Sequence, residues 1–196
     1  MEKVKSAFEK AMERAAAIGE MTAEEKEQLK EQEKIKTILS EYYKGDLDRD
    51  GLWKKMKGSK PESLRETQMS LINSLGLNMI PEEFLKRKDG ILAIESLKEQ
   101  QRVSVIEQVL DSIAGIQKEY QEGKEQASEQ LREAIESNPQ LRMKPVKAPD
   151  GRMTFQAAVS VDEAVQARLS EFLAEHEERY EFSFTKLIEK LKWEAK

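Results

Sequence analysis

Apolar residues recur every three or four positions along most of the chain, which is the spacing of helices that bury one face. Up to residue 88 these stretches are short and are separated by glycine or proline, whereas no proline follows until Pro139. We therefore predict an all-α protein in which a cluster of short helices, residues 1–88, precedes a long antiparallel helical hairpin, residues 89–196. We expect the tip of this hairpin, residues 138–159, to be irregular or a β-hairpin.

Local signals place the ends of the predicted helices. The first helix covers residues 4–18 and ends at Gly19, Asp48 caps a later one, and a stub runs from residue 81 to residue 88. A Ser or Thr three residues before a Glu forms a capping box, which satisfies two amides at a helix start. This spacing occurs three times: Thr22 with Glu25, Ser59 with Glu62, and Ser160 with Glu163.

Two long helices form the predicted hairpin. The first runs from Ile91 to Ser137, with Val105 on its apolar stripe and Gly115 and Gly123 as the points where it could bend. The second begins after Ser160 and is shorter, so part of the first must cover other helices or a second copy of the chain, which favours a homodimer. The stripe of the second helix is Val165, Leu169, Phe172, His176, Tyr180, Phe184, Leu187 and Leu191.

Composition narrows the class of protein. Charged residues make up 36% of the chain, which suits long helices with wide solvated faces. Cys is absent, so disulfides, thiolate zinc sites and Cys nucleophiles are excluded. The net charge of −5 argues against bulk binding of nucleic acid. With neither a secretory signal pattern nor an apolar run long enough for a membrane span, we expect a cytoplasmic protein without a membrane segment.

The segment from Asp46 to Gly51 resembles the first half of a calcium-binding EF-hand loop. The match fails at the last ligand position, where a bidentate carboxylate is required and Lys57 stands instead. A helix N-cap at Asp48 explains the same residues, so we predict no calcium site.

The single histidine, His176, has no metal-ligating neighbour one helical turn away. We predict that it is a partly buried packing residue with one hydrogen bond. The sequence contains no phosphate-binding glycine loop, no nucleophile elbow and no assignable acid–base pair. We therefore expect a protein that is not an enzyme and holds neither a cofactor nor a metal.

Two basic clusters in the short-helix region suggest an alternative function. Three short helices can imitate a helix-turn-helix, so the alternative is a nucleic-acid-associated regulator that acts through residues 54–60 and 86–88. Because the whole chain is acidic, we favour solvated faces balanced by acidic neighbours. The basic residues are Lys54, Lys55, Lys57 and Lys60, then Lys86, Arg87 and Lys88.

The hairpin tip combines positive charge with apolar side chains. An extended segment of this kind at the end of a helical arm is suited to receive a strand or helix of a partner, although a loop folded onto its own helices is equally compatible. The candidate partner-binding residues are Arg142, Met143, Lys144, Val146, Lys147, Arg152, Met153 and Phe155.

The helix–hairpin–helix order of residues 90–195 is similar in outline to prefoldin-type coiled-coil chaperones, over about half of the chain. This likeness concerns the order of elements and includes no shared motif. Because the apolar stripe is longer than the chain itself can readily cover, the sequence predicts a structural or interaction protein, a homodimer that binds a protein partner through its long helical arm.

Overall fold

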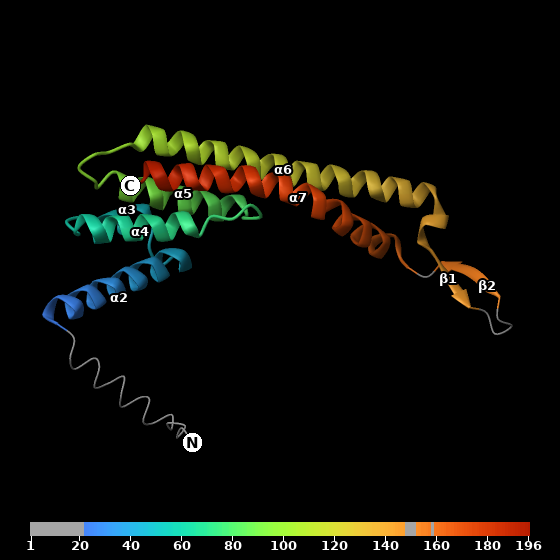
Figure 1. Cartoon of the computed structure of the whole chain (residues 1–196), viewed down its shortest axis with the longest axis horizontal. Coiled ribbons are helices and arrows are strands. Elements are labelled where there is room, and N and C mark those ends of the chain that lie inside the picture. The colour runs from blue at the N-terminus through green and yellow to red at the C-terminus, as the bar shows by residue number, and fades with distance from the viewer. Residues whose placement is uncertain (1–21, 148–151, 158) are drawn as a thin grey trace, which may run out of the picture.

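The computed structural model describes residues 22–147, 152–157 and 159–196. Within these ranges the regular secondary structure is helical apart from one pair of short strands, which confirms the all-α class (Figure 1). The predicted first helix, residues 4–18, lies outside the described residues. The elements are α2 (Ala23–Lys44), α3 (Arg49–Met56), α4 (Pro61–Asn73), α5 (Pro81–Glu95), α6 (Val103–Ser137), η1 (Pro139–Arg142), β1 (Met143–Lys147), β2 (Met153–Ala157) and α7 (Val161–Glu194).

Two of the three predicted capping boxes are confirmed. At the start of α2, the Thr22 hydroxyl accepts a hydrogen bond from the Glu25 amide at 3.1 Å, and the Glu25 carboxylate accepts one from the Thr22 amide at 2.7 Å. Ser160 and Glu163 form the same reciprocal pair at the start of α7. Polar side chains thus fix both helix starts from within the sequence.

The capping box predicted at Ser59 is wrong. Helix α4 starts at Pro61, and its N-cap is Lys60, which makes no side-chain capping bond. A proline disfavours the helical conformation in the residue before it, so Lys60 stays extended, with ψ at 150°, and cannot be the first helical residue. Ser59 therefore lies one residue too early to cap the helix.

The long helix predicted from Ile91 to Ser137 is two helices. Helix α5 continues through residue 88, where a stub was expected to end, and stops at Glu95. A connection, residues 96–102, leads to α6, which then runs unbroken through Gly115 and Gly123. The connection contains neither glycine nor proline, so no local signal marked the break.

Because of this break, the two long helices have nearly equal lengths. Helix α6 has 35 residues and α7 has 34, so each is about 50 Å long. The expected excess length of the first helix, from which a homodimer was inferred, is therefore absent. The two helices lie side by side and form an arm (Figure 1).

The main core lies where the short helices cover one end of the arm. Helix α5 packs against both α3 and α4, α5 also contacts α6, and α4 contacts α7, while α2 lies on α3 and α4 (Figure 1). A second, smaller core lies at the far end of the arm, where Ile135 of α6 is fully buried with Ala164 and Val165 of α7. The largest fully buried side chains of the main core include Leu52, Leu71, Ile72, Ile91, Ile106, Leu110, Ile113 and Leu191.

Three apolar residues that follow the helical spacing of their apolar neighbours are exposed in the structure. Leu29 of α2 is 47% exposed, Val105 of α6 is 38% exposed, and Phe172 of α7 is 43% exposed. Leu29 and Val105 lie near helix starts, and Phe172 lies between the two cores, so helical spacing alone did not reveal that neighbouring helices leave them uncovered.

The arm ends in an antiparallel pair of strands. The Cα atoms of β1 and β2 pair from Met143 opposite Ala157 to Lys147 opposite Met153. Pro145 is tolerated in β1 because both strands of a two-stranded sheet are edges.

Candidate functional site

The structure places the eight candidate partner-binding residues in one segment at the far end of the arm (Figure 1). Arg142 ends η1, Arg152 directly precedes β2, and the other six lie on the two strands. Strand pairing sets Lys147 opposite Met153. The segment is anchored to the arm by the small distal core, to which Leu141 and Val159 add partly buried side chains from either side of the hairpin.

A groove of about 510 Å³ lies at the base of the tip, between residues 141–143 and the first turns of α7. Its apolar lining includes Leu141, Val159 and Ala164, which belong to or pack on the distal core. Met143, which is 40% exposed, also lines it. We call this feature the tip groove.

Two arginines supply the positive charge of the tip groove. Arg168 Nη2 donates a hydrogen bond to the Leu141 carbonyl oxygen at 3.3 Å. The Nε atom of Arg142 is buried and has no hydrogen-bond partner among the described residues. A buried donor without an acceptor is unfavourable, so a turn of the guanidinium that brings this atom to an acceptor on a bound molecule would be favoured.

Two glutamates also line the tip groove. The Glu163 carboxylate accepts hydrogen bonds from the Ser160 amide at 2.9 Å and hydroxyl at 3.1 Å, so the N-cap of α7 occupies it. Glu171, one helical turn beyond Ala167, is exposed. The groove therefore has charges of both signs. Its polar atom without a hydrogen-bond partner among the described residues is Arg142 Nε.

Arg142 and Met143 of this groove were predicted from the sequence, whereas Arg168 was missed. A signal was present, because residues 164, 168 and 171 follow the spacing that places side chains on one face of a helix. The sequence did not show that residues 141–143 would lie against that face of α7.

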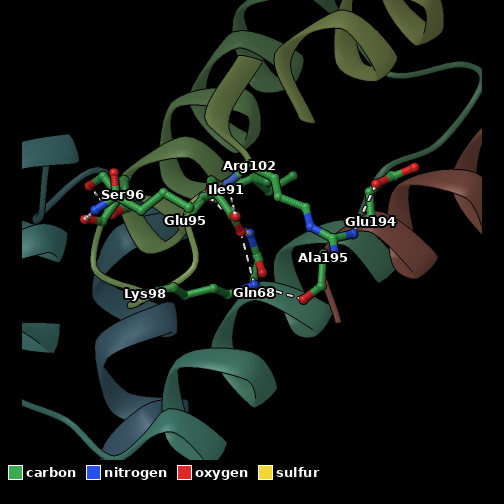
Figure 2. Close-up of polar contacts among 10 residues, drawn as sticks. Gln68, Ile91, Glu95, Ser96, Lys98, Arg102, Glu194 and Ala195 are labelled. Carbon is green, nitrogen blue, oxygen red and sulfur yellow. Dashed lines mark hydrogen bonds and ion pairs between the residues drawn. The ribbon is translucent and has the colours of Figure 1, made fainter. Parts of the chain in front are cut away.

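Among the described residues, the most buried charged group lies at the opposite end of the arm, close to Ala195. Glu95, at the end of α5, is 1% exposed. Its Oε2 accepts a hydrogen bond from Gln68 Nε2 at 2.8 Å and pairs with Lys98 Nζ at 2.9 Å, and its Oε1 accepts the Arg102 amide at 2.8 Å (Figure 2). These four residues form what we call the Glu95 cluster.

The Glu95 cluster keeps its carboxylate charged. Burial raises the pKa of Glu95, but the hydrogen bonds from Gln68, Lys98 and the Arg102 amide lower it by more, so the pKa lies below its ordinary value. A carboxylate that holds its charge this firmly does not shuttle protons near neutral pH.

The cluster also fastens the end of α7. Lys98 Nζ donates to the Ala195 carbonyl oxygen at 2.7 Å, and Arg102 Nη1 pairs with Glu194 Oε2 at 3.1 Å (Figure 2). A pocket of about 480 Å³ opens beside these residues, with charges of both signs on its walls. We interpret the cluster as structural, because most of its polar atoms bond to one another.

The acidic residues and His176 form no three-ligand cluster in the part of the chain that the structure describes. Asp48 instead accepts a hydrogen bond from the Gly51 amide at 2.7 Å, which confirms the predicted N-cap of α3.

His176 is a packing residue in an aromatic row on α7. Its ring lies 4.8 Å from that of Phe172 and 5.4 Å from that of Tyr180, measured between ring centroids. Tyr180 in turn contacts Tyr120 of α6 edge to face at 5.5 Å. Among the described residues His176 makes these ring contacts without the hydrogen bond that was predicted.

Several residues of the two basic clusters are paired with carboxylates. These ion pairs reduce the positive charge available to a phosphate backbone, so the structure gives the nucleic-acid alternative no additional support. The pairs are Lys55 with Glu41, Lys60 with Glu27 at 2.7 Å, Arg87 with Glu83 at 3.4 Å, and Lys88 with Asp111 at 2.5 Å.

No helix in the described ranges has both the length and the apolar character needed to cross a membrane.

Comparison with known proteins gives a family but no activity. No curated protein and no solved structure matches the chain. One family model matches residues 50–193, from α3 through nearly all of α7 and including the tip. The chain therefore belongs to the Family of unknown function (DUF6657).

Proposed function

We propose that the protein is a non-enzymatic interaction protein that binds a protein partner through the far end of its α6–α7 arm. The observation that carries this proposal is the projection of the arm beyond the short helices, together with a separate core at its end (Figure 1). We expect this interaction to take place in the cytoplasm, as the sequence predicts.

A separate core supports this function because it holds the tip in shape without help from the main bundle. Ile135 is fully buried and Val165 is 3% exposed. Both belong to a cluster that is separate from the main core formed with α2–α5. Each such side chain stabilises the folded state by about 1.5–3 kcal/mol when fully buried. The tip is therefore a preformed surface, which lowers the entropic cost of binding.

Photo-crosslinking in the native host tests the proposal. A photoreactive residue is placed at Gln140, which is exposed on η1 and lies outside the lining of the tip groove. The control position is Lys118, whose side chain is 75% exposed nearer the main core. We expect a reproducible cross-linked protein from position 140 and none from position 118. Equal products from both positions, or none from either, would contradict the proposal.

We propose in addition that the chain forms a homodimer through α7. The support is a pair of uncovered aromatic side chains on the arm, Phe172 at 43% exposure and Phe182 at 63%. A second copy of the chain presents the same side chains, so a symmetric contact would bury both pairs. The molar mass of the chain in solution tests this.

A further inference from the structure

We propose that the tip groove binds a short acidic segment of the protein partner, in which a carboxylate lies next to an apolar side chain. This inference rests on the proposed function and names the chemistry of the partner. It follows from the apolar lining of the groove, its unsatisfied arginine and the balance of charge on its walls.

The apolar lining selects a peptide over a small inorganic anion. Leu141, Met143 and Val159 line one side, and Ala164 and Ala167 line the side formed by α7. Alanine side chains are short, so they leave room for a ligand side chain against the helix. An anion without apolar surface gains nothing from these contacts, whereas a Leu or Phe next to an acidic residue buries its surface there.

Arg142 fixes where the carboxylate binds. Its Nε is buried and lacks an acceptor among the described residues. A carboxylate can accept hydrogen bonds from Nε and a terminal nitrogen of one guanidinium together, in the two-point geometry that makes arginine effective at carboxylate recognition. Because Nε is buried in the unbound chain, the guanidinium must turn toward the groove, and a bound Asp or Glu then satisfies an atom that has no acceptor within the described part of the chain.

Arg168 adds a second positive charge to the same groove. One of its donors is used by the Leu141 carbonyl oxygen, at 3.3 Å from Nη2, and a guanidinium carries five donors in all. That bond also holds Arg168 beside the residue that directly precedes Arg142. The two arginines thus line the groove from η1 and from α7.

The glutamates of the groove limit the kind of peptide that fits. Glu163 is held in the capping box by Ser160, and Glu171 is exposed about two turns further along α7. A long run of acidic residues would approach Glu171 and be repelled. We therefore expect one or two carboxylates near Arg142, with the apolar part of the peptide next to them.

Peptide display tests the inference with the full chain as bait. We expect selection from random dodecapeptides to enrich sequences that hold one or two acidic residues beside a large apolar residue. The affinity of a selected peptide is then measured by fluorescence anisotropy. Loss of a charge-assisted hydrogen bond should make Arg142→Gln bind at least about tenfold more weakly.

The matched control is Arg179→Gln, which removes the same charge from an exposed position of α7 outside the groove. We expect its affinity to stay within about twofold of the wild type, because an exposed charge beyond the groove acts only through screened solvent. Circular dichroism of both variants checks that each one folds.

Three outcomes would overturn the inference: no enriched peptide, enriched peptides without acidic residues, or equal weakening by both substitutions. A change of molar mass in Arg142→Gln would assign the groove to a second copy of the chain instead. Cross-linking from position 140 separates this inference from the proposed function. If the product persists while the peptide results fail, the arm still binds a partner and only the chemistry assigned to the groove is wrong.

Discussion

The carboxylate of Glu95 accepts a hydrogen bond from the backbone amide of Arg102 at 2.8 Å, across the connection between α5 and α6. The same carboxylate is nearly fully buried and is held by Gln68 and Lys98 as well. One side chain thus ends one helix, satisfies the backbone just before the next, and fixes the angle between them.

Removing this charge should destabilise the fold. Glu95→Gln keeps the size of the side chain but weakens three hydrogen bonds that a carboxylate accepts, so we expect a loss of about 2 kcal/mol or more in the free energy of unfolding. Urea unfolding followed by circular dichroism measures it. Glu99→Gln, in the same connection, is the control and should stay within about 0.5 kcal/mol of the wild type. Similar losses in the two variants would contradict the structural role of Glu95.

Acid should remove the stabilisation that Glu95 provides. The pKa of Glu95 is lowered from 4.5 in the folded protein, so as the pH falls the unfolded chain takes up a proton first. The contribution is therefore complete above the unfolded value and disappears as the pH falls through the folded pKa. Urea midpoints of the wild type and Glu95→Gln should differ near neutral pH and converge in acid. A gap that stays constant down to about pH 3 would count against this assignment.

The close contact between Gly90 and Tyr42 makes a second test of packing. A Cβ atom at Gly90 would lie 2.9 Å from a ring carbon of Tyr42, which is 1% exposed. We expect Gly90→Ala to destabilise the protein by about 1–3 kcal/mol, despite the higher helix propensity of alanine. Gly115→Ala is the control, because a Cβ atom at Gly115 of α6 would meet no described atom within 4 Å, and it should stabilise by up to about 1 kcal/mol. Thermal unfolding of both variants measures whether each substitution raises or lowers the stability of the fold.

The tyrosine ring has little freedom to move away from such a methyl group. Its hydroxyl donates a hydrogen bond to the Lys86 carbonyl oxygen. Burial, with a further contribution from Asp89, raises the pKa of Tyr42 to about 12, so the hydroxyl stays protonated and keeps donating. An unchanged stability of Gly90→Ala would mean that the ring shifts in spite of this bond.

The two cores should unfold separately when one of them is weakened. Ile135→Ala removes the fully buried centre of the distal core, a change that costs about 2–5 kcal/mol in typical cores. We expect faster hydrogen exchange around residues 131–169, with little change in α4 and α5. Ile113→Ala, in the main core, should instead lower the stability of the whole bundle. Faster exchange over the whole chain in Ile135→Ala would show that the tip is not an independent unit.

Light scattering at micromolar concentration tests the proposed homodimer. We expect twice the chain mass of 22.6 kDa for the wild type, and a shift towards the single-chain mass for Phe182→Ser. Leu85→Ser is the control, since Leu85 is 56% exposed on α5, away from the arm. A wild-type mass equal to one chain would exclude the dimer at that concentration.

The sequence by itself determined those features that depend on near neighbours in the chain. The class of the fold and the starts of α2, α3 and α7, with their caps at Thr22, Asp48 and Ser160, follow from hydrophobic spacing and from bonds within a few residues. The capping box predicted at Ser59 does not form for an equally local reason, because Pro61 holds Lys60 in an extended conformation.

Only the tertiary structure decided where the chain turns between α5 and α6 and what surrounds Arg142. The first depends on Gln68 meeting Glu95, 27 residues apart, and the second on Arg168 meeting the Leu141 carbonyl, also 27 residues apart. Buried polar groups must find partners wherever the fold brings them, and the spacing of residues along a chain does not specify contacts at that separation.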